Sequence, residues 1–414
     1  MEIVKLKQKA VSFYCHSLLL YITMKYILFI FCLAMLGCSL SSKKDVSNTQ
    51  KENPETEKQD FSEETSPKEV IDENVYYLKE EDLPEIEWFT LERVGVEHES
   101  SSDAFVFKDK FIIVSHKYPS PYIISVLDFK TKKVIAEYFK KGSGPKELFE
   151  GKVDIKDDVI TILDCVQGRI ARLDPELITK RKYAYEPQMT FVKNPFWLRY
   201  SVEYLNDSTI ISTNSQYIEG YDVGENVPEI SLVNVASGES MNEPYKLNGK
   251  CLPMNVTGGY TIKNEKGGIV ILAYMRVPKL RIMDMNLKTQ KVYIGPEKND
   301  MVYGMEPNSN MLTEIDGGSC FYTSACSSKN NIFLINDRVR KSDGSVFGCN
   351  KPNPFQEIWV LDHNGNIVRR LKNRNAEDDK QMYYISYSEP TQTIYVNAWD
   401  EDDEPQLYKC VLEK

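Results

Sequence analysis

Histidine is scarce in this sequence, and the short motifs that mark many enzyme classes are missing. The 414 residues include 4 histidines. No HExxH, HxxxH or CxxC spacing occurs, which disfavours zinc-protease, zinc-ribbon and thioredoxin-like chemistry. No Gly-x-Ser-x-Gly turn for a nucleophilic serine is present either. The sequence therefore predicts no catalytic residue, no cofactor and no histidine metal site.

The chain also lacks an excess of positive charge. It has 51 lysines and arginines against 61 aspartates and glutamates, which gives a formal net charge of −10. A nucleic-acid binding protein usually shows a basic footprint, so we expect no nucleic-acid partner. From Tyr76 to Lys414 no amphipathic helical window of any length is found, which argues against a helical domain.

An apolar run near the N-terminus is too short to cross a membrane. Eleven apolar residues extend from Tyr26 to Leu36. As a helix they would span roughly 16 Å, against about 30 Å for a bilayer core. Lys25 before the run and Gly37 after it are typical of a secretory signal. The Gly37-Cys38 ending resembles a bacterial lipobox, which implies that Cys38 is lipidated; an ordinary signal peptide or a short anchor is the alternative.

Three regions follow from this pattern. We expect residues 1–37 to be a signal peptide with translation starting at Met24, and residues 38–75 to be a lipid-anchored tether. Ser39 to Val75 contains ten acidic residues, five lysines and one aromatic residue, a composition that cannot bury enough apolar surface to fold. The remaining region, 76–414, is the folded domain. The predicted location is exported and lipid-anchored in the cell envelope, at the outer membrane or facing the periplasm.

The folded domain is predicted to be all-β. Short runs of β-branched and aromatic residues alternate with turns, as in "AFVFKDKFIIVS" and "YIISVLDFKTKKVIAEYF". Several hairpins share an Asp-containing corner: "VLDFKTKKV", "RIMDMNLKTQKV" and "VLDHNGNIV". If each corner joins the two outer strands of a unit, about six units fit the domain, and a period of four strands is typical of propeller blades. We therefore predict a six-bladed β-propeller with four-stranded antiparallel blades. The last blade would be completed by an N-terminal strand within Glu85–Val94.

One glycine-rich loop, "KKGSGPKELFEG", raises the possibility of a phosphate site. A dinucleotide loop needs a third glycine where Glu147 stands, and a helix must follow it. Here a strand follows, and Pro145 removes an N–H group. The loop is therefore predicted to be a structural corner, in which Gly142 and Gly144 adopt positive φ and Glu147 accepts hydrogen bonds from loop amides.

This corner carries a family resemblance. Gly142, Gly144, Pro145, Glu147 and Leu148, followed by Asp164, Arg169 and Ile170, resemble the signature of the TolB-like six-bladed propeller lipoproteins of Bacteroidetes. The signature covers about 36 residues of the chain. The resemblance implies a periplasmic or outer-membrane propeller, and it carries over no catalytic residue.

Other candidate sites lie in loops. Two loops exceed what hairpins require, and long loops on a rigid β scaffold are common binding elements; their candidate binding residues are Tyr217, Tyr221, Arg338, Arg340 and Phe347. The acidic "AWDEDDEPQ" segment offers Asp400, Asp402 and Asp403 as weak Ca²⁺ candidates, with a solvated hairpin tip as the alternative.

The sequence favours a binding or scaffolding module for an envelope protein or a glycan over an enzyme. The alternative is a hydrolase or lyase acting on glycans or peptides, with carboxylates that converge at the channel of the propeller.

Overall fold

The computed structural model describes most of the folded domain. The described residues are 74–96, 101–116, 120–149, 151–156, 159–164, 166–173, 188–191, 202–206, 208–213, 230–234, 237, 259–275, 277–296, 302–305, 312–316, 321–337, 356–375, 380–399 and 405–413. They belong to one compact unit, Val70–Lys414. In these ranges the only helical element is the 3-10 turn η1 (Glu80–Asp82), and no helix there is long and apolar enough to span a membrane.

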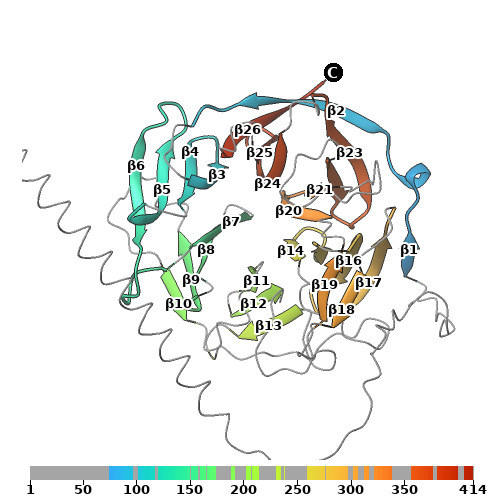
Figure 1. The fold of residues 1–414 in the computed structure, drawn as a ribbon, viewed down its shortest axis with the longest axis horizontal. Coiled ribbons are helices and arrows are strands. Elements are labelled where there is room, and N and C mark those ends of the chain that lie inside the picture. The colour runs from blue at the N-terminus through green and yellow to red at the C-terminus, as the bar shows by residue number, and fades with distance from the viewer. Residues whose placement is uncertain are drawn as a thin grey trace, which may run out of the picture. The chain divides into compact units, whose positions relative to one another are not determined.

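Antiparallel strands follow one another along the chain and form successive sheets (Figure 1). The first sheets are β3 (Ser101–Phe107), β4 (Phe111–His116), β5 (Tyr122–Asp128) and β6 (Val134–Lys140); β7 (Lys152–Lys156), β8 (Val159–Asp164), β9 (Arg169–Leu173) and β10 (Gln188–Phe191); and β11 (Val202–Asn206), β12 (Thr209–Thr213) and β13 (Ile230–Asn234). The next is β14 (Gly259–Asn264), β15 (Ile269–Tyr274), β16 (Lys279–Asp284) and β17 (Thr289–Ile294). A separate hairpin, β18 (Val302–Met305) and β19 (Leu312–Asp316), comes after it.

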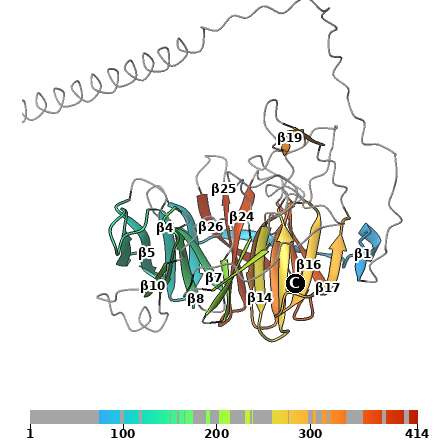
Figure 2. The ribbon, with the colours of Figure 1, turned by 90° about the horizontal axis from the view of Figure 1, so that it is seen from below.

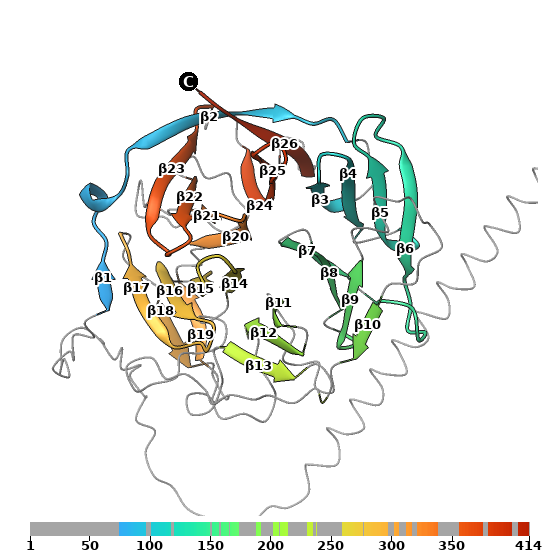
Figure 3. The same ribbon diagram turned by 180° about the vertical axis from the view of Figure 1, so that it is seen from behind.

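The C-terminal strands form an eight-stranded sheet in which two units share one N-terminal strand. The units are β20 (Tyr322–Ser327), β21 (Asn331–Asn336), β22 (Glu357–Asp362) and β23 (Ile367–Asn373), and then β24 (Gln381–Ser388), β25 (Thr393–Trp399) and β26 (Pro405–Leu412). Strand β2 (Ile86–Arg93) pairs antiparallel with β26, as predicted for Glu85–Val94. It also pairs in parallel with β23, and β1 (Val75–Tyr77) pairs in parallel with β17. The N-terminal segment therefore runs along the outer edges of successive sheets (Figure 3).

Burial distinguishes the inner strands from the outer ones. All residues of β15 are buried, whereas β17 is mostly half-buried or exposed. A strand buried on both faces needs a neighbouring sheet on each side, so its sequence is a continuous apolar run, "IVILAY". Figure 1 shows the sheets around a common centre, with β3, β7, β14, β20 and β24 on the inside. Figure 2 shows β7, β14 and β24 from the side.

Side chains link neighbouring sheets with hydrogen bonds to backbone atoms. Asn397 of β25 accepts from Ala104 N at 2.8 Å and donates to Ala104 O at 2.7 Å, which joins the last sheet to the first. Ser115 Oγ donates to Gly151 O at 3.0 Å between the sheets of β3–β6 and β7–β10. Sheets packed face to face around one axis, with the first joined to the last, define a β-propeller.

The predicted Asp corners are hairpin turns between the third and fourth strands of three units. Asp128 Oδ1 accepts from Lys130 N at 3.1 Å. Asp284 Oδ1 accepts from the backbone N–H of residue 286 at 2.9 Å, and Asp362 Oδ1 accepts from that of residue 364 at 2.9 Å. An aspartate side chain that accepts from the backbone two residues later stabilises a tight turn. The hairpins β5–β6, β16–β17 and β22–β23 thus repeat one local structure.

Candidate functional site

The glycine-rich corner lies between β6 and β7, and several of its amide groups donate hydrogen bonds to acceptors within the protein. Glu147 Oε2 accepts from Gly144 N at 2.9 Å. The positive φ expected at Gly144 is wrong: of the two glycines only Gly142 has φ above zero, at +159°, which is nearly extended. The lack of space for a side chain is the stronger reason for glycine at position 142, because a Cβ atom there would lie 2.1 Å from Glu147 Oε2. This loop has little room for an added anion.

Residues of the β8–β9 hairpin hold the corner in place. Arg169 Nη1 donates to Gly144 O at 2.6 Å and also to Glu147 O. Asp164, which is fully buried, accepts from Phe149 N at 2.7 Å and from Val166 N at 3.0 Å. The signature residues therefore contact one another, and these contacts support a structural role for the corner.

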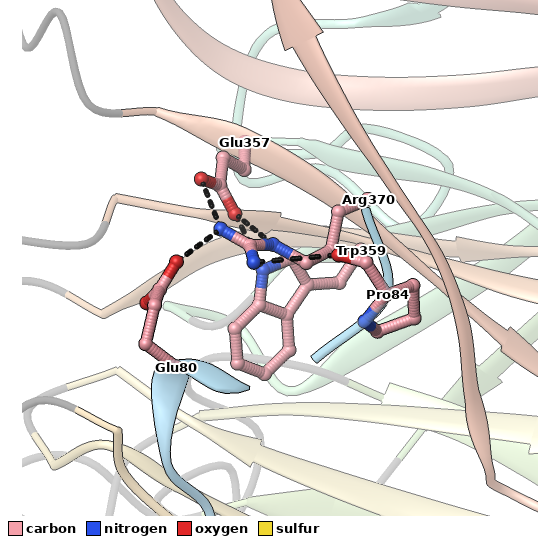
Figure 4. A network of polar contacts seen from close by, with 5 residues as sticks. All are labelled: Glu80, Pro84, Glu357, Trp359 and Arg370. Atoms are coloured by element: carbon pink, nitrogen blue, oxygen red, sulfur yellow. Dashed lines mark hydrogen bonds and ion pairs between the residues drawn. The ribbon is translucent and has the colours of Figure 1, made fainter. Parts of the chain in front are cut away.

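A buried ion pair attaches the N-terminal segment to the sheet of β20–β23 (Figure 4). Arg370 donates to both carboxylate oxygens of Glu357 at 2.9 Å, and to Glu80 Oε1 at 2.9 Å. The side chains of Arg370 and Glu357 are 4% and 3% exposed. Trp359 Nε1 donates to Glu357 Oε2 at 3.1 Å. Arg370 and Glu357 are buried and paired with each other, and Glu80 adds a second, half-exposed carboxylate, so we assign the cluster a structural role.

A second buried polar group lies where β21 ends. Gln356 Nε2 donates to Asp337 Oδ1 at 2.5 Å and to Met382 O at 2.7 Å, while Gln356 Oε1 accepts from Met382 N at 2.8 Å. This glutamine therefore joins the unit of β20–β23 to β24. Burial raises the pKa of Asp337 to about 7, although the hydrogen bond from Gln356 opposes the rise.

An open cavity of about 600 Å³ is formed by turns from four units of the propeller. It is lined by residues 106–108 at the β3–β4 turn, 265–266 at β14–β15, 327–329 at β20–β21, and 387–390 at β24–β25. These turns follow the inner strands of their units (Figure 1). Cavities of this size are typical of ligand-binding sites. We take it as the candidate functional site.

The rim of the cavity carries lysines and glutamates. Lys266 and Lys329 are exposed and Lys108 is half-buried. Glu389 Oε1 accepts from Lys329 N, and Glu265 Oε1 accepts from the ammonium group of Lys263 at 2.9 Å. Both carboxylates therefore already have partners within the protein.

The floor of the cavity is buried and combines hydroxyl groups with aromatic rings. Phe107, Ser327, Ser328 and Ser388 are buried lining residues. Ser388 Oγ donates to a carboxylate of the β3–β4 turn at 2.6 Å. Among the described residues, the buried Ser327 Oγ has no hydrogen-bond partner.

Tyr387 contributes the aromatic wall of the cavity. Its ring stacks on Phe333, with 4.8 Å between centroids and 19° between planes. Burial raises the pKa of the Tyr387 hydroxyl, and the charge of Glu389 raises it further. The hydroxyl is therefore neutral at neutral pH, and it can both donate and accept hydrogen bonds.

The sequence-predicted residues that the structure describes are those of the corner. The others lie outside the described residues: Cys38, Tyr217, Tyr221, Arg338, Arg340, Phe347, Asp400, Asp402 and Asp403. In the part of the chain that is described, no group of three or more His, Cys, Asp or Glu side chains is arranged to hold a metal ion.

Sequence reasoning missed the cavity lysines and Tyr387. Each lies in or beside a short turn between two predicted strands, as in "FKDKF", "NEKGG" and "SSKNN". Lysine is common at such turns, so the turn pattern alone could not rank these above other surface charges.

Comparison with known proteins gives only distant likenesses. No protein-family model matches the sequence, and no curated protein matches it. Among solved structures, a Bacteroides fragilis protein whose name describes it as exported is 9% identical with a TM-score of 0.45, covering 82% of this chain and 100% of that chain. A DUF4221 family member from Bacteroides vulgatus is 14% identical with a TM-score of 0.44, covering 83% and 94%. Streptogramin B lyase is 12% identical with a TM-score of 0.41, covering 78% and 98%.

Such low similarity carries no conclusion about activity. The β-propeller assignment rests on the sheet order and the inter-sheet hydrogen bonds of this chain. The resemblance to TolB-like lipoproteins stays a prediction.

Proposed function

We propose that this protein is an exported, lipid-anchored, six-bladed β-propeller that binds a glycan or protein partner at the cell envelope. The observation that carries the binding role is the cavity of about 600 Å³, to which four units contribute turns. Its lining combines an aromatic ring, buried hydroxyl groups and a charged rim, which are the usual components of a recognition site. A glycan suits this lining better than an extended peptide, because sugar rings stack on aromatic side chains such as Tyr387 while their hydroxyl groups form hydrogen bonds.

The blade count in this proposal comes from the order of the strands. Four sheets precede the C-terminal sheet if the hairpin β18–β19 is set aside, and the C-terminal sheet contains two units. Strand β2 serves as the outer strand of the last unit, β24–β26. A shared strand of this kind protects the outer edge that the last unit would otherwise expose.

The export and anchoring parts of the proposal rest on the sequence around Cys38. A Cys38→Ser variant should lose incorporation of labelled fatty acid and should move from the membrane fraction to the soluble fraction. Retention of both the label and the membrane location would contradict lipidation at this residue.

The competing function is a glycan hydrolase or lyase, since Glu265 and Glu389 both line the cavity. Glycoside hydrolysis needs one carboxyl group to donate a proton and another to act as base or nucleophile. In this structure both glutamates accept hydrogen bonds from the protein itself. These contacts favour binding over catalysis.

One experiment separates the two functions. The full chain in detergent is applied to an array of neutral and acidic glycans, and any glycan that binds is recovered and analysed for cleavage. We expect binding with the glycan recovered intact. Tyr387→Ala should weaken binding about tenfold or more, because stacking and burial at the site are lost. Tyr77→Ala, at an exposed residue on the outer strand β1, is the control.

Three outcomes would count against the proposal. Cleaved products that depend on Glu265 or Glu389 would establish the enzyme alternative. Equal binding by Tyr387→Ala and the wild type would exclude the cavity as the site. No binding to any glycan would overturn the glycan part of the proposal and leave a protein partner to be tested.

A further inference from the structure

The acidic and basic side chains around the cavity differ in whether they have partners within the protein. Among the described residues, three lysines and two glutamates line it, and Asp109 lies in the β3–β4 turn beside the lining residues. Asp109 accepts hydrogen bonds from Ser388 Oγ at 2.6 Å and from the Tyr395 hydroxyl at 3.2 Å. These three carboxylates thus have partners within the protein.

Two lysines of the rim, in contrast, have no carboxylate partner among the described residues. Lys266 Nζ donates to the neutral Asn330 Oδ1 at 2.7 Å. Within the described ranges, neither Lys266 nor Lys329 has a carboxylate partner for its ammonium group. Lys108, in the β3–β4 turn, also lines the cavity. The ammonium groups of Lys266 and Lys329 therefore remain available at the rim, although the whole chain has a net charge of −10.

The floor of the cavity also presents an uncharged polar group, the hydroxyl of Ser327. Ser327 is 7% exposed, it lines the cavity, and its hydroxyl has no hydrogen-bond partner among the residues that the structure describes. A buried polar atom without a partner costs free energy, so such an atom often belongs to a site that a ligand completes.

We propose that the cavity binds an acidic oligosaccharide, whose carboxylate or sulfate groups pair with Lys266 and Lys329 while a sugar ring packs on Tyr387. This inference rests on the proposed binding function and names its ligand class. Charge-assisted hydrogen bonds from ammonium groups to carboxylate or sulfate are stronger than neutral ones. The aromatic wall supplies the contact that an inorganic anion could not use.

The test measures binding of defined trisaccharides to the full chain by calorimetry. The probes are a galacturonate trisaccharide and a sulfated galactose trisaccharide, each compared with the neutral galactose trisaccharide. The test variant is the double substitution Lys266→Gln and Lys329→Gln. The matched control is Lys130→Gln with Lys133→Gln, which removes two charges from the β5–β6 turn, outside the cavity lining.

We expect at least one acidic trisaccharide to bind about tenfold or more tightly than the neutral one, and the test variant to lose that advantage. The affinity should also fall as salt rises from about 50 mM to about 500 mM, since rim charges are screened. The two acidic probes distinguish a carboxylate ligand from a sulfate ligand. The control variant should bind as the wild type does.

Three results would overturn the inference. If the neutral trisaccharide binds as tightly as both acidic ones, or if the test variant binds as the wild type does, the lysines do not select the ligand. Either result leaves the proposed glycan-binding function intact, because binding itself persists. If none of the three trisaccharides binds, the acidic-oligosaccharide inference fails, and the glycan array decides separately whether the proposed function fails with it.

Discussion

Replacing Asp337 by asparagine removes a buried carboxyl group whose ionisation the fold opposes. Asp337 is 2% exposed and accepts a hydrogen bond from Gln356, the residue that links β24 to the preceding unit. Asparagine keeps an oxygen acceptor at the same position, so the link to Gln356 is preserved. The substitution therefore tests the charge and leaves the packing nearly unchanged.

The magnitude follows from the pKa of this carboxyl group. Burial raises it from 3.8 to about 7. Because the folded pKa is raised, the neutral carboxyl contributes its full stability below the unfolded pKa, and that contribution is lost as the pH rises through about 7. A difference of this size corresponds to about 4 kcal/mol of unfolding free energy. Roughly 2–3 kcal/mol of it should be lost between about pH 5 and about pH 8.

The assay is urea unfolding of the full chain, followed by tryptophan fluorescence across this pH range. We expect Asp337→Asn to gain stability relative to the wild type as the pH rises, by about 1.4 kcal/mol per pH unit until the gain levels off near pH 7. Glu81→Gln makes the same carboxylate-to-amide change at a side chain that is 72% exposed, so it serves as the control. A stability difference between Asp337→Asn and wild type that stays constant with pH would refute the reasoning.

Three further predictions concern the packing of the sheets, and the midpoint of thermal or urea unfolding checks each of them. Arg370→Met should lower the free energy of unfolding by about 3–5 kcal/mol, because it leaves a buried carboxylate without its partner. Arg369→Met, at a neighbouring exposed ion pair, should lower it by less than about 1 kcal/mol. Equal losses would contradict the structural role of the buried pair. Asn397→Ala should cost about 2–4 kcal/mol, since two buried backbone groups lose their hydrogen bonds, and an effect below 0.5 kcal/mol, within the usual range for surface changes, would argue against the contact. Gly267→Ala should lower the free energy of unfolding by about 2 kcal/mol or more, because its Cβ atom would lie 1.7 Å from a backbone oxygen. Gly268→Ala, with φ of +60° and open space around it, should lower it by about 1 kcal/mol. The reverse order would contradict the described turn.

Local sequence patterns predicted much of the β architecture. The Asp corners at residues 128, 284 and 362 became the turns of outer hairpins, because an aspartate side chain needs only the next few backbone amides to form such a turn. The strand within Glu85–Val94 pairs with β26, as the need to complete the last unit suggested. The parallel pairing of β2 with β23 was not predicted, since nothing in either strand indicates a second neighbour.

The corner motif was predicted in part. We predicted that Glu147 accepts a hydrogen bond from a loop N–H group, which depends only on residues close in sequence. The structure contains this bond, from Gly144 N. The contacts from Arg169 to the corner carbonyls were not predicted, because they join segments about 25 residues apart whose approach depends on how β7, β8 and β9 pair.

The sequence by itself determined the elements: the strands, from alternating and continuous apolar runs, and the turns between them, from aspartate, glycine and lysine. Only the tertiary structure decided where these turns meet. Lys108, Lys266, Lys329 and Tyr387 come from four separate hairpins, and the cavity that they line exists because their units pack side by side around one axis. The physical reason is that a strand and its turn depend on contacts within a few residues, whereas a cavity depends on long-range packing that no short stretch of sequence specifies.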